Sequence, residues 1–424
     1  MTDHLIDGLA RVDRSLNKVI DLNTLMSAFD NYIDAVTQPT GGVAGVPIGF
    51  LFRKVNAAQV ARLWLDKYYG QKAAPAVRPQ GPPDPYEGRK KLLVVGGTSG
   101  MGYEDALATA TGVAALAAIF LTFLKAGDHL IVSDVCYAGA NELARRILPD
   151  FGIEVSAVNL SKPEDLRAAL RPNTKLVHCE SPCNPLLRLT DLRKIAEITH
   201  AHGALMSVDS TFATPVATQP LKFGADLVMH SLTKFINGHG DALGGIVAGR
   251  KELTEKMRGR AGVYLGASLS AMNAWLILRG IDTLYPRMRQ IHETAQNIAA
   301  FLEAHPAVKR VIYPGLASHP QADLARAQMA IAGGVITFQT ADPQAMARQL
   351  SERLKVAHYA FSLGHQRSIV VLLDTAEMMA SSYQLEGAQF EDYRNYAGEG
   401  VFRLSVGLED CADLRADLDQ ALRM

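Results

Sequence analysis

Two hydroxyl side chains and one lysine follow a short apolar run in the middle of the chain. Residues 227–229 predict a buried strand, and Ser231, Thr233 and Lys234 come directly after it. A lysine at the end of a buried strand is desolvated, which lowers its pKa and frees the neutral amine to attack a carbonyl. The two hydroxyl groups could hold a phosphate beside that amine. The same residues would also fit a helix N-cap followed by a surface lysine.

An aspartate ends the strand that is predicted before this one. Residues 205–208 form a mostly apolar run, and Asp209 follows at its end. A strand-end carboxylate and the strand-end Lys234 are the pair that pyridoxal 5'-phosphate chemistry needs. The lysine forms a Schiff base with the aldehyde, and the carboxylate keeps the pyridine nitrogen protonated so that the ring can accept electrons. The alternative for Asp209 is a cap on the loop that follows.

Four motifs occur in a fixed order along about three quarters of the chain, from about residue 104 to the C-terminus. They are Glu180-Ser-Pro-Cys-Asn-Pro185, Val208-Asp-Ser-Thr-Phe212, Ser231-Leu-Thr-Lys234 with Gly238-His239, and Arg403-Leu-Ser-Val-Gly-Leu-Glu409. Together they resemble the signatures of the Cys/Met-metabolism enzymes that depend on pyridoxal phosphate. That family contains the cystathionine and methionine γ-lyases, the cystathionine synthases and the O-acylhomoserine sulfhydrylases.

The resemblance implies an α/β fold of the fold-type-I PLP-dependent transferase class, which is aspartate aminotransferase-like. Such a fold has a mostly parallel central sheet and a smaller α+β C-terminal domain. We therefore expect an N-terminal arm with a proline-rich insertion over residues 1–85, a cofactor-binding α/β domain over 86–288, and the α+β domain over 289–424.

The hydrophobic pattern predicts alternating helices and strands without reference to any family. Apolar strands are expected at 130–132, 155–158, 176–177, 205–208 and 227–229, with helices at 104–124, 165–170 and 191–202. A long amphipathic connection at 270–300 precedes strands at 308–313, 333–338 and 402–406. This alternation is typical of a mostly parallel sheet that is covered on both faces. Ligands bind at the C-terminal strand ends of such sheets, where Tyr137, Asn184, Asp209 and Lys234 are expected.

The resemblance assigns catalytic roles to three residues. Lys234 would carry the cofactor and move the substrate's α-proton, and Asp209 would hold the pyridine nitrogen. Tyr137 matches the family tyrosine that stacks on the ring and that can also act as an acid toward the leaving group. Asn184 would form a hydrogen bond near the phenolic oxygen of the cofactor. A partly buried core tyrosine is the alternative for Tyr137.

The phosphate of the cofactor is expected at the start of a helix. Gly112 and Val113 match that position of the family, where backbone N–H groups and the helix dipole favour an anion. Ser231 and Thr233 would complete the phosphate site. The alternative for Gly112 is a helix-interior glycine that permits close packing.

One arginine is expected to bind the substrate. Arg403 lies in an otherwise apolar strand, and a buried arginine needs an anionic partner. The family uses this arginine for the substrate α-carboxylate, whose geometry its guanidinium matches. Ser362, in a Ser-Leu-Gly segment of the family, is also expected at the substrate. A structural ion pair is the alternative for Arg403.

In this family an N-terminal arm reaches a neighbouring subunit with a Tyr-x-Arg-x-x-Asn-Pro element that binds the partner's cofactor phosphate. Arg53 and Asn56 keep this spacing, but Leu51 replaces the tyrosine and the proline is missing. Arg53 is thus either a phosphate ligand in trans or a surface arginine. Tyr86 and Arg89, in the insertion that follows, are further candidates. The family precedent implies a homotetramer of tight dimers.

The substrate pocket departs from the family pattern. Phe361 stands where enzymes that bind the distal amino acid of cystathionine have glutamate, and it disfavours a second ammonium group. The family's Glu-Ser-Leu is Arg-Ser-Ile at 367–369, and its Met-Thr-His segment is replaced around 378–383. We predict γ-elimination from a methionine-like or other γ-substituted L-amino acid, giving an α-keto acid and ammonia. The alternatives are sulfhydrylase-type γ-replacement, cystathionine β- or γ-lyase activity, and a non-catalytic relative that binds the cofactor.

A glycine-rich loop at 92–102 supports a rival hypothesis, because it resembles a dinucleotide-binding turn. No acidic residue follows at the expected spacing, however. The Tyr-x-x-x-Lys pair, Tyr68 and Lys72, precedes the loop instead of following it. These observations disfavour an NAD(P) site.

Composition excludes several other classes. Lys+Arg and Asp+Glu number 43 each, and this zero net charge argues against nucleic acid as a partner. The four cysteines form neither a Cys-x-x-Cys pair nor a zinc pattern, which favours a reduced, cytoplasmic protein without a metal. The N-terminus does not resemble a signal peptide. The uncharged stretch 106–124 contains threonines and many alanines, so we expect a buried helix and no membrane span.

Overall fold

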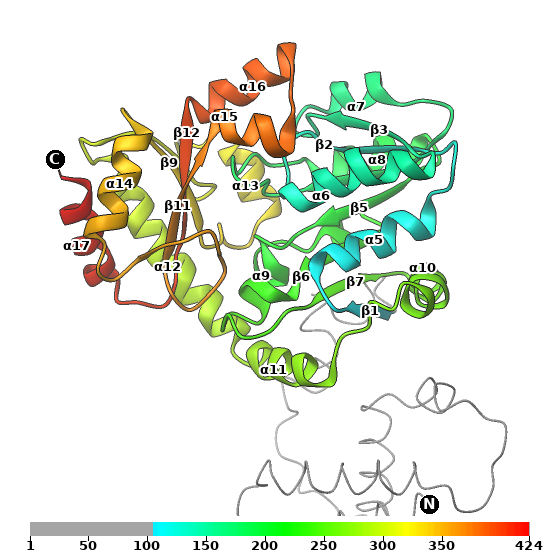
Figure 1. The fold of residues 1–424 in the computed structure, drawn as a ribbon, viewed down its shortest axis with the longest axis horizontal. Coiled ribbons are helices and arrows are strands. Elements are labelled where there is room, and N and C mark those ends of the chain that lie inside the picture. The colour runs from blue at the N-terminus through cyan, green and yellow to red at the C-terminus, as the bar shows by residue number, and fades with distance from the viewer. Residues whose placement is uncertain (1–104, 424) are drawn as a thin grey trace, which may run out of the picture. The chain divides into compact units, whose positions relative to one another are not determined.

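A computed structural model describes residues 105–423, which form two β-sheets with helices packed around them (Figure 1). The first sheet has seven strands in the order β1-β7-β6-β5-β4-β2-β3. Its strands are β1 (Asp105–Thr109), β2 (His129–Ser133), β3 (Glu154–Val158), β4 (Thr174–Glu180), β5 (Leu205–Asp209), β6 (Leu227–Ser231) and β7 (Gly245–Gly249). Neighbours from β6 to β3 pair in parallel, whereas β7 is antiparallel to both β6 and β1. The prediction of a mostly parallel sheet is therefore confirmed.

Helices cover both faces of this sheet because successive strand residues point to opposite sides. Leu130 and Leu176 pack into one apolar cluster, while the next residues, Ile131 and Val177, pack into another. The helices of the first cluster are α5 (Gly112–Phe123) and α10 (Lys251–Met257), and those of the second are α7 (Pro163–Ala169) and α8 (Leu192–Ala201). The buried strands β2, β4 and β6 contain continuous apolar runs in the sequence, which is why their positions could be predicted.

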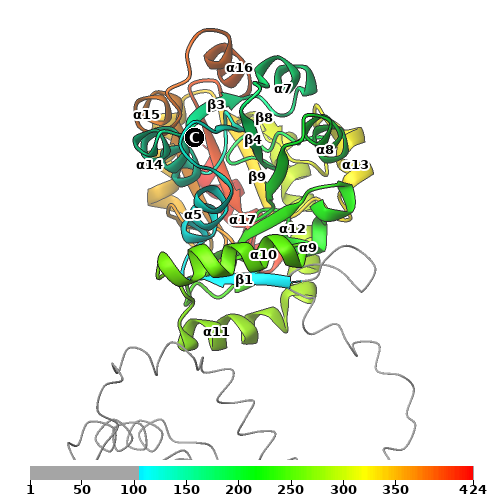
Figure 2. The same cartoon turned by 90° about the vertical axis from the view of Figure 1, so that its right-hand side faces the viewer.

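The helix that was predicted from residue 104 begins later, and this prediction was wrong at its start. Residues 105–109 form β1, which lies at the sheet edge next to α10 (Figure 2). Thr111 is extended, with φ −149° and ψ 164°, and its hydroxyl accepts the N–H of Ala114 at 3.0 Å. This N-cap makes Gly112 the first helical residue.

In the described part of the chain, no helix has the length and apolarity that a membrane crossing needs.

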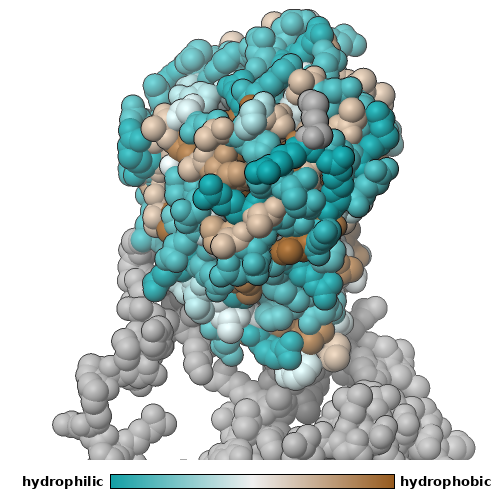
Figure 3. All heavy atoms as spheres, turned by 90° about the vertical axis from the view of Figure 1, so that its left-hand side faces the viewer, coloured by the Kyte–Doolittle hydropathy of each residue, from teal (hydrophilic) through white to brown (hydrophobic). Residues whose placement is uncertain are grey.

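The second sheet has five strands in the order β10-β11-β12-β9-β8. They are β8 (Val308–Ile312), β9 (Val335–Thr340), β10 (His358–Tyr359), β11 (Ile369–Asp374) and β12 (Gly400–Ser405). The helices around it are α13 (Ala322–Gln328), α14 (Pro343–Arg353), α15 (Thr375–Met378), α16 (Gly387–Ala397) and α17 (Cys411–Leu422). The face over α14 and α17 is mostly hydrophilic with small scattered apolar areas (Figure 3).

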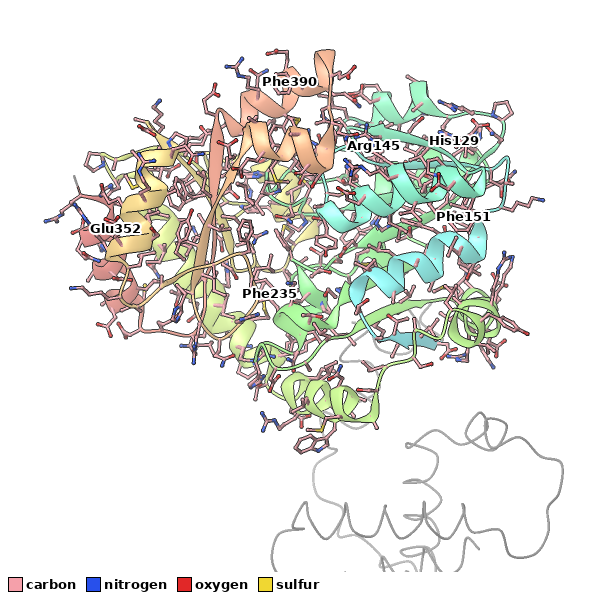
Figure 4. The ribbon with its side chains drawn as sticks, viewed as in Figure 1. His129, Arg145, Phe151, Phe235, Glu352 and Phe390 are labelled. Carbon is pink, nitrogen blue, oxygen red and sulfur yellow. The ribbon has the colours of Figure 1, made fainter. Side chains whose placement is uncertain are left out.

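Two helices connect the sheets, as the amphipathic pattern at 270–300 predicted. They are α11 (Ala271–Ile281) and α12 (Leu284–Glu303), so the predicted domain boundary at residue 288 falls within α12. One apolar cluster contains Phe235 from the turn after β6, Ile291 from α12 and Phe338 from β9 (Figure 4 labels Phe235).

The remaining short elements are α6 (Ala138–Glu142), α9 (Thr214–Ala217), 3-10 turns at Leu148–Phe151 and Pro220–Phe223, and π-helical turns at Leu143–Ile147, Leu232–Ile236, Arg258–Gly262 and Met379–Tyr383.

Arg287 ties the start of α12 to the turn that follows β6. Its buried guanidinium donates hydrogen bonds to the carbonyls of Phe235 at 2.8 Å, Ile236 at 3.0 Å and Gly280 at 2.8 Å. The carbonyls of Phe235 and Ile236 would otherwise be buried without a partner in the described part of the chain, which is costly. The carbonyl of Gly280 also accepts hydrogen bonds from Thr283. Burial also lowers the pKa of Arg287, to about 10. The arginine therefore fixes the backbone of the turn at Leu232–Ile236, which contains Lys234.

We expect Arg287→Met to lower the free energy of unfolding by about 2 kcal/mol, because it leaves buried carbonyls unpaired. Chemical denaturation of the cofactor-free protein measures this value. Arg289→Met is the matched control, because Arg289 is exposed on the same helix. Equal stability of the two variants would show that Arg287 does not hold this turn.

Candidate active site

A cavity of about 370 Å³ lies at the carboxyl ends of the parallel strands in the first sheet. Residues of both halves of the described chain contribute to its lining. The lining includes nine of the predicted site residues: Gly112, Val113, Tyr137, Asn184, Asp209, Ser231, Thr233, Lys234 and Arg403. Ser362 does not line the cavity itself, although its neighbours Phe361 and Leu363 do.

Lys234 presents an amine without a protein partner to this cavity. It follows β6 directly, and its φ of −92° and ψ of −140° interrupt the π-helical turn in which it lies. Within residues 105–423, nothing accepts a hydrogen bond from its amine. Burial lowers the pKa of Lys234, and the positive charge of nearby Arg403 lowers this pKa further. Both effects increase the fraction of neutral amine, which is the nucleophilic form.

The turn before β11 packs closely against Lys234. Gly364 has a φ of +76°, and a Cβ built on it would lie 2.9 Å from the Cβ of Lys234 and 2.6 Å from the N of Phe235. The N–H of Gly364 donates to the Ser405 hydroxyl at 2.9 Å. Any larger residue at 364 would push the lysine turn away, since this backbone conformation and this close approach both require glycine.

Asp209 ends β5 and offers one carboxylate oxygen to a ligand. Its Oδ1 accepts hydrogen bonds from the Thr211 N–H at 2.9 Å and the Thr211 hydroxyl at 2.6 Å, whereas Oδ2 has no partner in the described part of the chain. Burial raises the pKa of Asp209 to about 6, although the bonds from Thr211 act in the opposite direction. Glu180 is its neighbour across the sheet, and burial together with the charge of Asp209 raises the pKa of Glu180 as well.

An anion site is open at the N-terminus of α5. The N–H groups of Gly112 and Val113 have no intrahelical partner, because they belong to the first turn. A Cβ on Gly112 would lie 3.0 Å from the Ser231 Cβ and 3.1 Å from its Oγ, so a larger residue would have to displace Ser231 slightly. The Ser231 hydroxyl has no hydrogen-bond partner among residues 105–423. The Thr233 hydroxyl, in contrast, is already bonded to the backbone of Gly244.

Arg403 is buried in β12 without a counter-ion. Its Nη1 donates to Oδ1 of Asn184 at 3.1 Å, and its Nη2 donates to the carbonyls of Phe361 at 2.6 Å and Ser362 at 3.4 Å. Its buried Nε has no partner, and no carboxylate of the described residues forms an ion pair with it. Burial lowers the pKa of Arg403 to about 10. The structural ion pair considered as the alternative is thus absent from the described chain, and an anionic ligand would supply the missing charge.

Glu180 holds two of the cavity residues in place. Its carboxylate accepts the N–H of Tyr137 and the N–H of Asn184, both at 2.7 Å. The Tyr137 ring is 43% exposed, so it is not a core tyrosine. A Cβ on Gly139 would lie 2.6 Å from Cε1 of Tyr137. The sequence Tyr137-Ala-Gly-Ala140 therefore has a glycine where this ring needs space.

Sequence reasoning predicted nine of the 18 residues that line the cavity, but it missed other residues that shape the site. Thr211 and Gly139 gave no signal of their own, and Glu180 was noted only as the first residue of a motif. The predicted phosphate ligand Arg53, like the candidates Tyr86 and Arg89, lies outside the described residues. The glycine-rich loop at 92–102 and the pair Tyr68 and Lys72 lie outside them too.

The groups around this cavity fit pyridoxal 5'-phosphate. Lys234 offers a free amine that would react with the aldehyde, and the open oxygen of Asp209 could accept the N–H of the pyridine ring. The N–H groups at the start of α5 and the unpaired Ser231 hydroxyl suit the phosphate. These features together define an enzyme site for amine-to-carbonyl chemistry on an amino acid.

The family model of the Cys/Met metabolism PLP-dependent enzymes matches residues 100–423, and the chain belongs to this family. It is 44% identical over 325 residues to the canavanine gamma-lyase of Pseudomonas canavaninivorans. The aligned residues cover 76% of this chain and 79% of that relative. It is 39% identical over 324 residues to the L-methionine gamma-lyase of Porphyromonas gingivalis, with 76% and 79% covered.

A solved relative confirms the fold. The crystal structure of metB from Corynebacterium glutamicum aligns with a TM-score of 0.70 and 35% sequence identity, covering 76% of this chain and 81% of that one. The predicted fold-type-I architecture, the enzyme class and the cofactor, pyridoxal 5'-phosphate, are thereby confirmed.

We expect Asp209→Asn to stabilise the cofactor-free protein at pH 8, by roughly 1–3 kcal/mol. A raised folded-state pKa means that Asp209 contributes stability below its unfolded pKa and that this stability is lost as the pH rises through about 6. The advantage of the variant should therefore shrink as the pH falls from 8 to 5, which denaturation at several pH values measures. Asp282→Asn, at an exposed position, is the control. A variant that is less stable than wild type at pH 8 would contradict the assigned burial of this charge.

Proposed function

We propose that the protein is a lyase that uses pyridoxal 5'-phosphate to eliminate the γ-substituent of an L-amino acid, giving an α-keto acid and ammonia. The observation that carries this proposal is the placement of Arg403 beside Lys234 in one cavity. The two side chains are close enough for the charge of Arg403 to lower the pKa of the lysine amine. A carboxylate bound by Arg403 would therefore bring the α-carbon of an amino acid toward that amine.

Four polar residues of the cavity have separate tasks in this reaction. The cofactor, when bound, supplies an electron sink for the substrate's α- and β-carbons. Arg403 would bind the α-carboxylate, and the amine of Lys234 would take the α-proton and then a β-proton, whose electron pair expels the γ-substituent. Water then releases the α-keto acid and ammonia. The Tyr137 hydroxyl gives a proton to the leaving group. Asp209 would accept the N–H of the pyridine ring and so keep that nitrogen protonated.

The phosphate and the phenolic oxygen of the cofactor have their own partners in this proposal. The backbone N–H groups of Gly112 and Val113 and the Ser231 hydroxyl bind the phosphate. Thr233 supports the phosphate loop through its bonds to Gly244. Asn184 holds Arg403 through its amide oxygen and leaves its amide nitrogen for the cofactor's oxygen.

Part of the cavity lining is apolar. Phe361, Leu243 and Val113 line it and are exposed to 76%, 56% and 38%. Such a surface suits an uncharged γ-substituent better than the second ammonium group of cystathionine. The names of the relatives point to methionine and canavanine as the first substrates to test. Replacement of the γ-substituent by a thiol, as in sulfhydrylases, is the second candidate because it uses the same residues.

The assembly and the compartment are parts of the same proposal. We infer a cytoplasmic homotetramer with active sites at dimer interfaces, as the family precedent implies. Arg53 of one subunit would then reach the cofactor phosphate of its neighbour. The domain limits at 85 and 288 belong to this proposal too.

A substrate panel on purified protein tests this function. It contains methionine, homocysteine, cystathionine, cysteine, canavanine, and O-acetylhomoserine with and without sulfide, and it measures released α-keto acid and ammonia. We expect keto acid from methionine or canavanine and little from cystathionine. The Lys234→Ala variant should show no turnover, because it lacks the amine that moves the α-proton.

Two results would overturn the assignment. Turnover that requires sulfide would make the protein a γ-replacement enzyme. Normal turnover by Lys234→Ala would remove Lys234 from the mechanism, and with it the proposed chemistry.

A further inference from the structure

Tyr383 reaches from the second half of the described chain to the loops that carry the candidate active site. It ends the π-helical turn Met379–Tyr383 and is buried, with 1% of its surface exposed. Its hydroxyl lies 2.9 Å from the carbonyl oxygen of Cys136 and 3.0 Å from that of Asn184. These two carbonyls belong to loops after β2 and β4, more than 40 residues apart in sequence.

Both carbonyls adjoin residues of the site. Cys136 directly precedes Tyr137, and Asn184 accepts a hydrogen bond from Arg403. Glu180 accepts the N–H groups of Tyr137 and Asn184 on the same two loops. The loops are therefore tied twice, by a carboxylate that accepts their N–H groups and by a phenol that faces their carbonyls.

The turn that carries Tyr383 is itself anchored to the first half. Arg145, labelled in Figure 4, donates a hydrogen bond to the carbonyl of Tyr383. Arg146 donates another to the carbonyl of Ser381 at 2.9 Å. Burial raises the pKa of Tyr383 well above its ordinary value, so the hydroxyl keeps its proton and remains a donor. It has one proton for two acceptors, and both carbonyls depend on it.

We propose that Tyr383 is a positioning residue that keeps Tyr137 and the Asn184–Arg403 pair in register for binding of an amino-acid substrate. The effect of Tyr383 on substrate binding rests on the proposed function. The effect of Tyr383 on the two loops does not depend on that function. The turn at 378–383 is one of the segments in which the sequence departs from the family pattern. Tyr383 thus links this turn to the loops that carry Tyr137 and Asn184.

The chain contains a matched control for this residue. Tyr393 is also fully buried, belongs to the same apolar cluster, and has its ring centroid 5.7 Å from that of Tyr383. Its hydroxyl has no hydrogen-bond partner in the described part of the chain. Tyr383→Phe and Tyr393→Phe therefore remove the same group from the same surroundings, but only the first breaks a link to the site.

Hydrogen exchange of the cofactor-free protein, followed by mass spectrometry, gives the first test. We expect peptides that contain Tyr137 and Asn184 to exchange faster in Tyr383→Phe than in wild type, and to be unchanged in Tyr393→Phe. This measurement needs neither cofactor nor turnover, so it decides the structural role even where the proposed function fails. Unchanged exchange in Tyr383→Phe, or equal acceleration in both variants, would overturn the proposal.

Binding of glycine to the cofactor-loaded protein gives the second test, followed by the change in visible absorption. Glycine has the α-carboxylate but no substituent that can leave. We expect about three- to tenfold weaker binding in Tyr383→Phe, the effect of losing one hydrogen bond. The Tyr393→Phe variant should bind glycine as the wild type does. Unchanged glycine affinity in Tyr383→Phe would overturn the link to substrate binding.

Discussion

The site depends on charged groups that the fold removes from water without giving them charged protein partners. Lys234, Asp209 and Arg403 face one cavity, and no ion pair within residues 105–423 neutralises any of them. Burial of an unpaired charge costs stability, and the shifted pKa values of all three groups reflect that cost. A cofactor with an aldehyde and a basic ring nitrogen, and a substrate with a carboxylate, would supply what each group lacks. The arrangement of the cavity thus favours ligand binding and lowers the stability of the protein without ligands.

The two halves of the described chain must pack together before this site exists. Lys234 and Asp209 come from the first sheet, whereas Arg403 comes from β12 in the second. Arg287 of α12 fixes the turn of Lys234, and Gly364 of the second half packs against it. The apolar cluster that contains residues of both sheets keeps these contacts in place. Stability and catalysis are therefore coupled through the same contact region.

Much of this arrangement could be predicted from the sequence. The parallel strands are continuous apolar runs, and the reactive residues follow the strand ends directly, so local patterns locate both. The fold class followed from the motifs. β1 was missed, because its five residues continue without a break into the alanine-rich helix and are too few for a clear period.

The contacts between distant residues could not be predicted. Arg403 meets Asn184 across 219 positions, and Tyr383 meets Cys136 across 247. No local pattern encodes such a pair, and the double role of Glu180 as an acceptor for two loops is equally invisible in the sequence. Arg53 stays a prediction, since it lies outside the described residues.

The central claim is that Lys234 is the residue that carries the cofactor, and chemical trapping tests it most directly. The protein loaded with pyridoxal 5'-phosphate is reduced with sodium borohydride, digested, and mapped by mass spectrometry. We predict one phosphopyridoxyl adduct, on the peptide that contains Lys234. An adduct on another lysine, or no adduct at all, would contradict the account of the site given above.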